Sequence, residues 1–159
     1  MKSLEIKEFR FADVDWIDGL NWHQNTHESA PYFFGSEALA FWPENFNSDS
    51  LFALSNDGQW MGWIGLNPVL DPFGSLGISE ILFGYDPTKA DRNCMMLAIN
   101  FLLIKARSLG FWSCLIHLKK DSELLPFLVD SGFKILGQKY SGGNASTKNE
   151  LLILEKRLH

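Results

Sequence analysis

Apolar and polar side chains alternate, or apolar residues follow one another in short runs, in seven stretches that we predict to be β-strands. A longer apolar segment, from about Asp91 to Leu109, has the length of a helix. Shorter helices are predicted after Asp13 and over Ser122–Ser131. The predicted strands are Leu4–Phe9, Leu51–Leu54, Trp60–Leu66, Ile78–Tyr85, Trp112–Leu118, Phe133–Tyr140 and Glu150–Leu158.

Two connections between these elements carry strong local signals. The sequence Ser55-Asn56-Asp57-Gly58 separates two half-buried runs, and a turn of this composition predicts a β-hairpin. The stretch Ile78–Gly110 reads as a strand, a proline-bearing turn and a helix in immediate succession. Because a helix that starts directly after a strand points its unpaired N–H groups beyond that strand, this turn is a natural place for a phosphate.

Composition and charge set limits on the class of protein. A chain of 159 residues, 46% of them hydrophobic and 21% charged, predicts one soluble domain that spans residues 1–159. The net charge of −5 and the pI near 5.3 argue against nucleic acid as a partner, which needs a basic face. The run Asn93–Ile104 is too short to span a bilayer, so we expect no membrane association.

The first residues lack the apolar core of a signal peptide, and Cys94 and Cys114 show no pairing pattern. We therefore expect reduced thiols in a core and a cytoplasmic location. His23 and His27 lie four residues apart, but no third ligand is evident and Pro31 follows closely. No metal site is predicted on this basis.

The order of elements resembles that of the GCN5-related N-acetyltransferase (GNAT) superfamily over nearly the whole chain. Four segments carry the resemblance: NDGQWMGWIGL, ISEILFGYDP, RSLGFWSCLIHL and LLPFLVDSGFKILGQKY. The resemblance implies a single α/β domain with a twisted, mostly antiparallel mixed sheet, one splayed parallel strand pair and helices on both faces. It also implies transfer of an acyl group from acetyl-CoA to a small amine or a protein amine.

In this superfamily the cofactor's pyrophosphate lies on a turn that reads Q/R-x-x-G-x-G/A, whose glycines let the backbone approach the anion. The matching segment here is Ala90-Asp91-Arg92-Asn93-Cys94-Met95, which lacks both glycines. Asp91 suits an empty helix end, because its carboxylate would cap free N–H groups. Lys89 and Arg92 offer a cationic clamp, with two solvated charges as the alternative. The resemblance assigns cofactor contacts to Leu82, Phe83, Lys89, Ala90, Asp91, Arg92, Asn93 and Cys94.

Glu80 is the candidate catalytic base. It takes the place of the glutamate in the "AEI.F" strand of histone-acetylating members of the superfamily. A carboxylate beside Ile78, Ile81 and Phe83 would be desolvated, which makes it a stronger base. The alternative is an outward-facing residue on a two-sided strand.

The superfamily's usual acid is the tyrosine of "fYeklGF", and this position is Leu128 here. Tyr85 and Tyr140 are candidate substitutes, with ordinary half-buried rings as the alternative. His117 alternates with apolar residues on a strand and is interpreted as an edge or satisfied core histidine. Cys114 sits in an apolar strand without a paired His and Asp, so we do not predict a thiol nucleophile.

Glu28 and Tyr32 are assigned to the acceptor side of the site by analogy with the superfamily. The run THESAPYFF also resembles phage-encoded GNAT-like proteins that carry an "HAES.Y" segment before the hairpin. This narrower resemblance gives an alternative hypothesis: a catalytically inactive GNAT fold that serves as a structural or interaction module, carried in a virion. Aromatic residues make up 14% of the chain, and a protein partner would bind to the aromatic-rich N-terminal half. The aromatic candidates are Trp22, Phe33, Phe34, Phe41 and Trp42.

Overall fold

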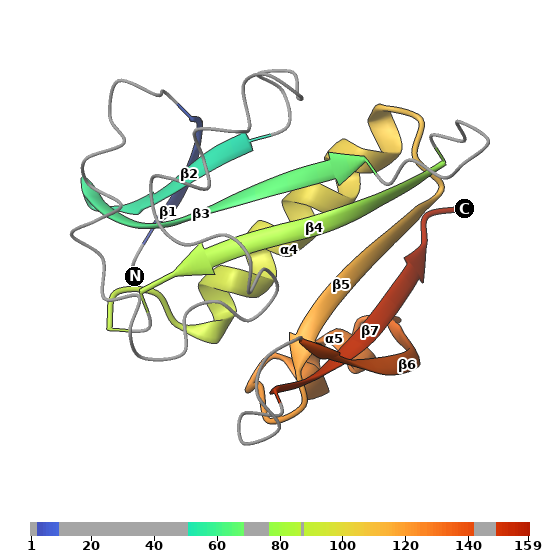
Figure 1. The fold of residues 1–159 in the computed structure, drawn as a ribbon. Coiled ribbons are helices and arrows are strands. Elements are labelled where there is room, and N and C mark those ends of the chain that lie inside the picture. Colours follow the sequence, from blue (N-terminus) through green and yellow to red (C-terminus); the bar gives the residue numbers. More distant parts are fainter. Residues whose placement is uncertain (1–2, 10–50, 69–76, 87, 142–148) are drawn as a thin grey trace.

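The computed structural model describes residues 3–9, 51–68, 77–86, 88–141 and 149–159 (Figure 1). The helix predicted after Asp13, the histidine pair and the aromatic N-terminal segment with Glu28 and Tyr32 lie outside these residues. The described elements are β1 (Leu4–Glu8), β2 (Leu51–Asn56), β3 (Gln59–Pro68), β4 (Ile78–Tyr85), α4 (Arg92–Ser108), β5 (Ser113–Lys119), α5 (Leu125–Asp130), β6 (Lys134–Ser141) and β7 (Asn149–Arg157).

The seven strands form one sheet in the order β1-β2-β3-β4-β5-β7-β6. Every neighbouring pair is antiparallel except β4 and β5, which run parallel. The predicted mixed sheet with one parallel pair is therefore confirmed. The two described helices pack on the same face, so the prediction of helices on both faces stays a prediction. Neither of these helices has the length and hydropathy that a bilayer crossing requires.

The predicted hairpin is confirmed, and its turn has only two residues. Asn56 pairs with Gln59, and the residues between them, Asp57 and Gly58, have φ angles of 50° and 78°. Two consecutive positive φ angles define the type I′ turn, whose twist matches that of the flanking strands. Asp and Gly tolerate this backbone region better than most residues do, which explains the sequence signal.

Both described helices end on a Gly-Phe pair, by the same motif. After α4, Gly110 has a φ of 92°, and the N–H of Phe111 donates to the carbonyl of Ala106. After α5, Gly132 has a φ of 105°, and the N–H of Phe133 donates to the carbonyl of Leu128. These are Schellman motifs, in which a glycine in the left-handed region lets the chain reverse. A glycine therefore ends each of the two described helices.

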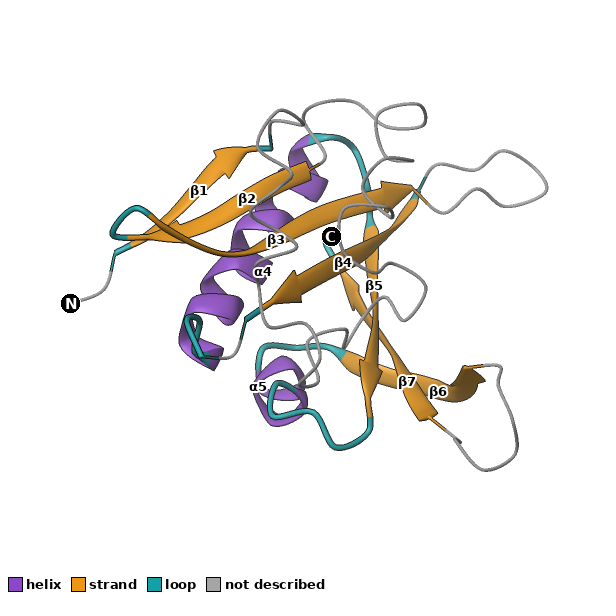
Figure 2. Cartoon of the chain, turned by 60° about the vertical axis from the view of Figure 1, so that its left-hand side comes forward, coloured by secondary structure: helices purple, strands orange, loops and turns teal. Residues whose placement is uncertain are grey.

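One face of the sheet holds the main core, which α4 covers (Figure 2). The buried residues of α4 recur every three or four positions and include Met95, Ile99 and Leu102, which are inaccessible to solvent. On β4 the residues Ile81 and Phe83 belong to this core. Because side chains alternate along a strand, Glu80 and Leu82 lie on the opposite face of the sheet.

The parallel pair is joined along only part of its length. Ile78, Ser79 and Glu80 pair with Ser113, Cys114 and Leu115, and the ladder ends there. Figure 1 shows β4 and β5 close together at this end and diverging towards the start of α4. The predicted splayed pair is thus present, and its open part begins immediately after Glu80.

Candidate active site

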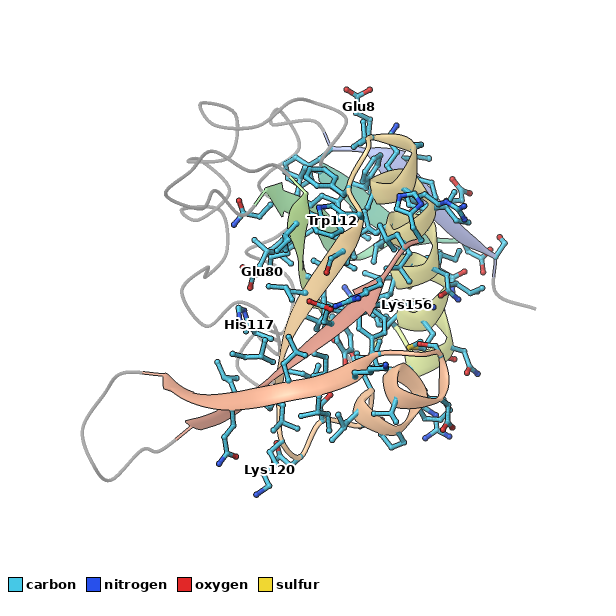
Figure 3. The ribbon with its side chains drawn as sticks, turned by 90° about the vertical axis from the view of Figure 1, so that its right-hand side faces the viewer. Glu8, Glu80, Trp112, His117, Lys120 and Lys156 are labelled. Atoms are coloured by element: carbon cyan, nitrogen blue, oxygen red, sulfur yellow. The ribbon has the colours of Figure 1, made fainter. Side chains whose placement is uncertain are left out.

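A carboxylate and an imidazole meet at the point where β4 and β5 separate. Nδ1 of His117 is hydrogen-bonded to Oε1 of Glu80, which joins the two diverging strands. The side chain of Glu80 is 16% exposed and that of His117 is 15% exposed, so the pair is partly desolvated and still open to solvent. Figure 3 shows both side chains on the side of the sheet away from α4.

The register of the strands explains why these two residues meet. Glu80 lies opposite Leu115, and His117 follows two positions later on β5. A step of two residues keeps the side chain on the same face of the sheet. The imidazole therefore reaches back across the opening to the last paired residue of β4.

This geometry changes the interpretation of both residues. Glu80 is neither fully exposed nor surrounded only by apolar groups, because it has an imidazole partner. Of the two positions predicted for His117, the sheet edge is wrong, since β5 lies between β4 and β7. The ring is instead largely buried and hydrogen-bonded. With Nδ1 bonded to the carboxylate, Nε2 is the ring nitrogen left to exchange a proton, and among the described residues it has no hydrogen-bond partner. The pair can therefore hold and transfer one proton.

The turn between β4 and α4 is closed by its own side chains. The carboxylate of Asp86 accepts hydrogen bonds from the N–H and hydroxyl of Thr88, at 2.9 and 2.6 Å. The carbonyl of Asp86 accepts from the N–H groups of Lys89 and Ala90. Ala90 is buried, so its side chain faces the protein. The N–H groups of Lys89 and Ala90 are thus already used within the turn.

Asp91 caps the start of α4, as its position predicts. Its carboxylate accepts a hydrogen bond from the N–H of Cys94 at 2.8 Å. The cap leaves the N–H groups of Arg92 and Asn93, for which the described residues supply no acceptor. Two backbone donors therefore remain at this helix end, beside one negative charge.

Lys89 and Arg92 make contacts with different parts of the protein. Arg92 lies over the ring of Phe127 on α5, 4.7 Å from its centroid. Lys89 lines a pocket with the β2–β3 hairpin. Arg92 thus lies between α4 and α5, whereas Lys89 lies on the hairpin side, so the two do not form a clamp in this conformation.

The position of the superfamily's tyrosine offers no acid. Leu128 is inaccessible to solvent and belongs to the core. Tyr85 is buried in the same core, stacked with Phe83 and on the face opposite Glu80, and the side chain of Tyr140 lies outside the described residues. Neither described position can donate a proton beside Glu80.

The described cysteines have no catalytic surroundings. Both are buried and neither is in a disulfide, and burial raises the pKa of the Cys114 thiol, against a smaller opposite effect of its hydrogen bond to Ser79. A thiol with a raised pKa is a poor nucleophile. The described part of the chain also contains no cluster of three His, Cys, Asp or Glu side chains suited to a metal ion.

The cofactor residues predicted from the resemblance have different environments. The side chains of Phe83, Ala90 and Cys94 are buried, and Phe83 faces the core that α4 covers. Leu82 is buried on the face that also carries Glu80. Lys89, Arg92 and Asn93 are exposed, as is the capping Asp91. The sequence did not predict that His117 pairs with Glu80, because this contact depends on the register between two strands far apart in the chain.

Comparison of the sequence with family models and with curated proteins gave no match. Comparison of the fold with solved structures gave many matches. A GCN5-related N-acetyltransferase from Kribbella flavida is 16% identical, with 97% of each chain covered and a TM-score of 0.74. The protein yncA from Salmonella typhimurium, solved with its cofactor acetyl-CoA, is 13% identical over 98% of this chain and 94% of its own, with a TM-score of 0.78.

A third similar structure is a chimera of the spermidine N-acetyltransferase SpeG from Vibrio cholerae and hSSAT. It is 14% identical over 98% of this chain and 95% of its own, with a TM-score of 0.73. The resemblance to phage proteins finds no counterpart among these three. From the sheet order, the splayed parallel pair and these matches, the chain has the fold of the GCN5-related N-acetyltransferases.

Proposed function

We propose that this chain transfers the acyl group of acetyl-CoA to a primary amine and that the Glu80–His117 pair accepts the proton of that amine. The observation that carries the proposal is the position of the pair. It lies where β4 and β5 separate, on the face of the sheet opposite α4, and it is partly open to solvent. The described residues offer no other carboxylate–imidazole pair.

Acyl transfer to a primary amine requires a group that accepts a proton. A primary amine is mostly an ammonium ion at neutral pH and must lose a proton before its nitrogen can attack. Acetyl-CoA supplies a thioester carbonyl: a new C–N bond forms at this carbon and the C–S bond breaks. The pair takes the first proton of the ammonium group, at Oε2 of Glu80 or Nε2 of His117. After the attack the same nitrogen loses its second proton, which goes to the departing thiolate. Hydrogen bonding between the two side chains fixes their orientation, which lowers the entropic cost of this step.

The start of α4 has the groups to hold the pyrophosphate. The N–H groups of Arg92 and Asn93 and the Arg92 guanidinium are donors at a positive helix end. These two N–H groups precede the first helical hydrogen bond and are therefore available without glycine, although the side chains of Arg92 and Asn93 leave the anion less room than glycines would. The Asp91 carboxylate opposes the anion and should weaken its binding.

A small cationic amine suits this chain as the acceptor. The chain carries a net charge of −5, which attracts cations over a distance. The similar structure that is named for spermidine supports an acceptor of this class. A protein amine is the second acceptor class, and an acyl-transfer assay with polyamines and with a lysine peptide distinguishes them.

Calorimetric titration with acetyl-CoA tests the cofactor site. We expect binding in the micromolar range, and we expect Arg92→Gln to weaken it by about tenfold or more, because a charge-assisted hydrogen bond contributes about 1.5–3 kcal/mol. Arg107→Gln, at the other end of the same exposed helix surface, is the matched control and should bind like the parent. A titration with desulfo-CoA, which lacks the sulfur atom, shows whether that atom contributes to binding. Absence of any heat at millimolar acetyl-CoA would refute the proposal and favour a non-catalytic role for the fold.

Asp91 variants should separate stability from cofactor binding. Asp91→Ala removes the cap of α4, which should lower the free energy of unfolding by about 0.5–2 kcal/mol. The same change removes a negative charge near the pyrophosphate, so acetyl-CoA should bind more tightly. Asp91→Asn keeps a capping oxygen, and we expect it to retain most of the stability and still bind more tightly. Chemical denaturation and calorimetry measure the two quantities. Weaker binding in both variants would contradict the assigned position of the anion.

A further inference from the structure

A polar pocket lies on the other side of the β4–α4 turn from Arg92, and no step of the proposed acyl transfer uses it. Its volume is about 240 Å³. The β2–β3 hairpin and the turn after β4 form its walls, and a hydrogen bond of 2.8 Å from the N–H of Asp86 to the carbonyl of Met61 joins the two segments. Figures 1 and 2 both show the hairpin turn and the start of α4 at the same end of the sheet. The lining residues are Asn56, Asp57, Gln59, Met61, Thr88 and Lys89.

The pocket carries one charge of each sign. Asp57 comes from the hairpin and Lys89 from the turn before α4. In the described part of the chain the two make no ion pair with each other or with another residue. Both side chains are nevertheless attached to fixed backbone, Asp57 in the type I′ turn and Lys89 through its N–H to Asp86. The two opposite charges are thus held by different walls of one pocket.

A buried amide lines the pocket between these walls. Asn56 is 7% exposed, and its Oδ1 has no hydrogen-bond partner in the described structure. A buried acceptor without a donor is costly, and such groups are normally satisfied by water or by another polar group. Because Oδ1 is itself inaccessible to solvent, a donor in the pocket reaches it once the Asn56 side chain turns toward the pocket.

We propose that this pocket binds a small zwitterion of amino-acid size. Its ammonium group would donate to the Asp57 carboxylate and, once the Asn56 amide turns toward the pocket, to Oδ1 of Asn56. Its carboxylate would accept from Nζ of Lys89. A volume of about 240 Å³ accommodates such a molecule. A metal ion does not fit, because the lining offers only one carboxylate. An anion alone or an amine alone would leave one of the two charges without a partner.

The proposal is independent of acyl transfer, because Glu80 and His117 do not line the pocket. Binding here would still affect the neighbouring turn. Lys89 lies two residues before the Asp91 cap, so a ligand that holds Lys89 also restrains the segment that leads into α4.

Calorimetric titration without acetyl-CoA tests the pocket directly. The probes are L-alanine, L-serine and L-glutamine, with ethanolamine and propionate as ligands that carry only one of the two charges. We expect at least one amino acid to bind at about 10 mM or below and the single-charge ligands to bind at least about tenfold more weakly. Asp57→Asn, which keeps a residue suited to positive φ, and Lys89→Gln should each weaken amino-acid binding by about tenfold or more.

Lys134→Gln, an exposed lysine on β6, is the matched control and should bind like the parent. No binding of any of the three amino acids at about 10 mM, or binding unchanged in both pocket variants, would overturn the proposal. If ethanolamine or propionate bound as tightly as the amino acids, only one of the two charges would be recognised, and the proposal would also be overturned. Because acetyl-CoA is absent from the experiment, failure here leaves the acyl-transfer proposal untouched.

Discussion

Replacement of Glu80 by glutamine is expected to lower the rate constant for acyl transfer by about a hundredfold or more. General base catalysis contributes this much because the proton is removed as the bond to carbon forms. Glutamine has the shape of glutamate and can still accept a hydrogen bond from His117, so the fold should be retained. The rate is measured by thiol release from acetyl-CoA at saturating amine, and folding is checked by circular dichroism.

His117 variants show which partner takes the proton. If the pair acts as a unit, His117→Gln and the double variant should lose about as much activity as Glu80→Gln, since residues that act together give non-additive losses. If Glu80 alone is the base, His117→Gln should lose less. A Glu80→Gln protein with the parent's rate would remove Glu80 from the mechanism.

Replacement of Phe83 by alanine is expected to lower the free energy of unfolding by about 3–5 kcal/mol. Its ring is inaccessible to solvent, lies in the core that α4 covers, and stacks on Tyr85 with 6.2 Å between ring centroids. Removing it leaves a cavity that the strands around it cannot close. Urea denaturation followed by tryptophan fluorescence measures the change.

Leu97→Ala provides the matched control on the covering helix. Leu97 lies on α4 with 59% of its side chain exposed, so we expect a change within about 0.5 kcal/mol. A similar loss for Leu97→Ala and Phe83→Ala would mean that the core does not lie between β4 and α4.

Local signals account for most of what the sequence predicts correctly. The hairpin turn depends on Asp57 and Gly58 alone, and each helix end depends on one glycine and the phenylalanine after it. The cap at Asp91 depends on contacts within three residues. Such features form from neighbouring residues, so a single sequence contains the information that specifies them.

The candidate site was harder to predict because it depends on register. Whether His117 faces Glu80 is set by the pairing of two strands separated by a whole helix, and a shift of one residue would turn the imidazole to the other face. The separation of Lys89 from Arg92 depends likewise on contacts with the hairpin and with Phe127. Neither arrangement leaves a pattern in the sequence near the residues concerned.

The short ladder between β4 and β5 also divides the sheet into two parts. Strands β1 to β4 form one antiparallel unit and β5 to β7 another, and within the described residues the main chains of the two units are hydrogen-bonded along a short seam from Gly77 to Glu80. Side chains of both units nevertheless pack into one core under α4. Glu80 lies at the end of the seam, and its hydrogen bond to His117 crosses the opening on the other face of the sheet. The Glu80–His117 pair therefore also links the two halves of the sheet at the place where their main chains separate.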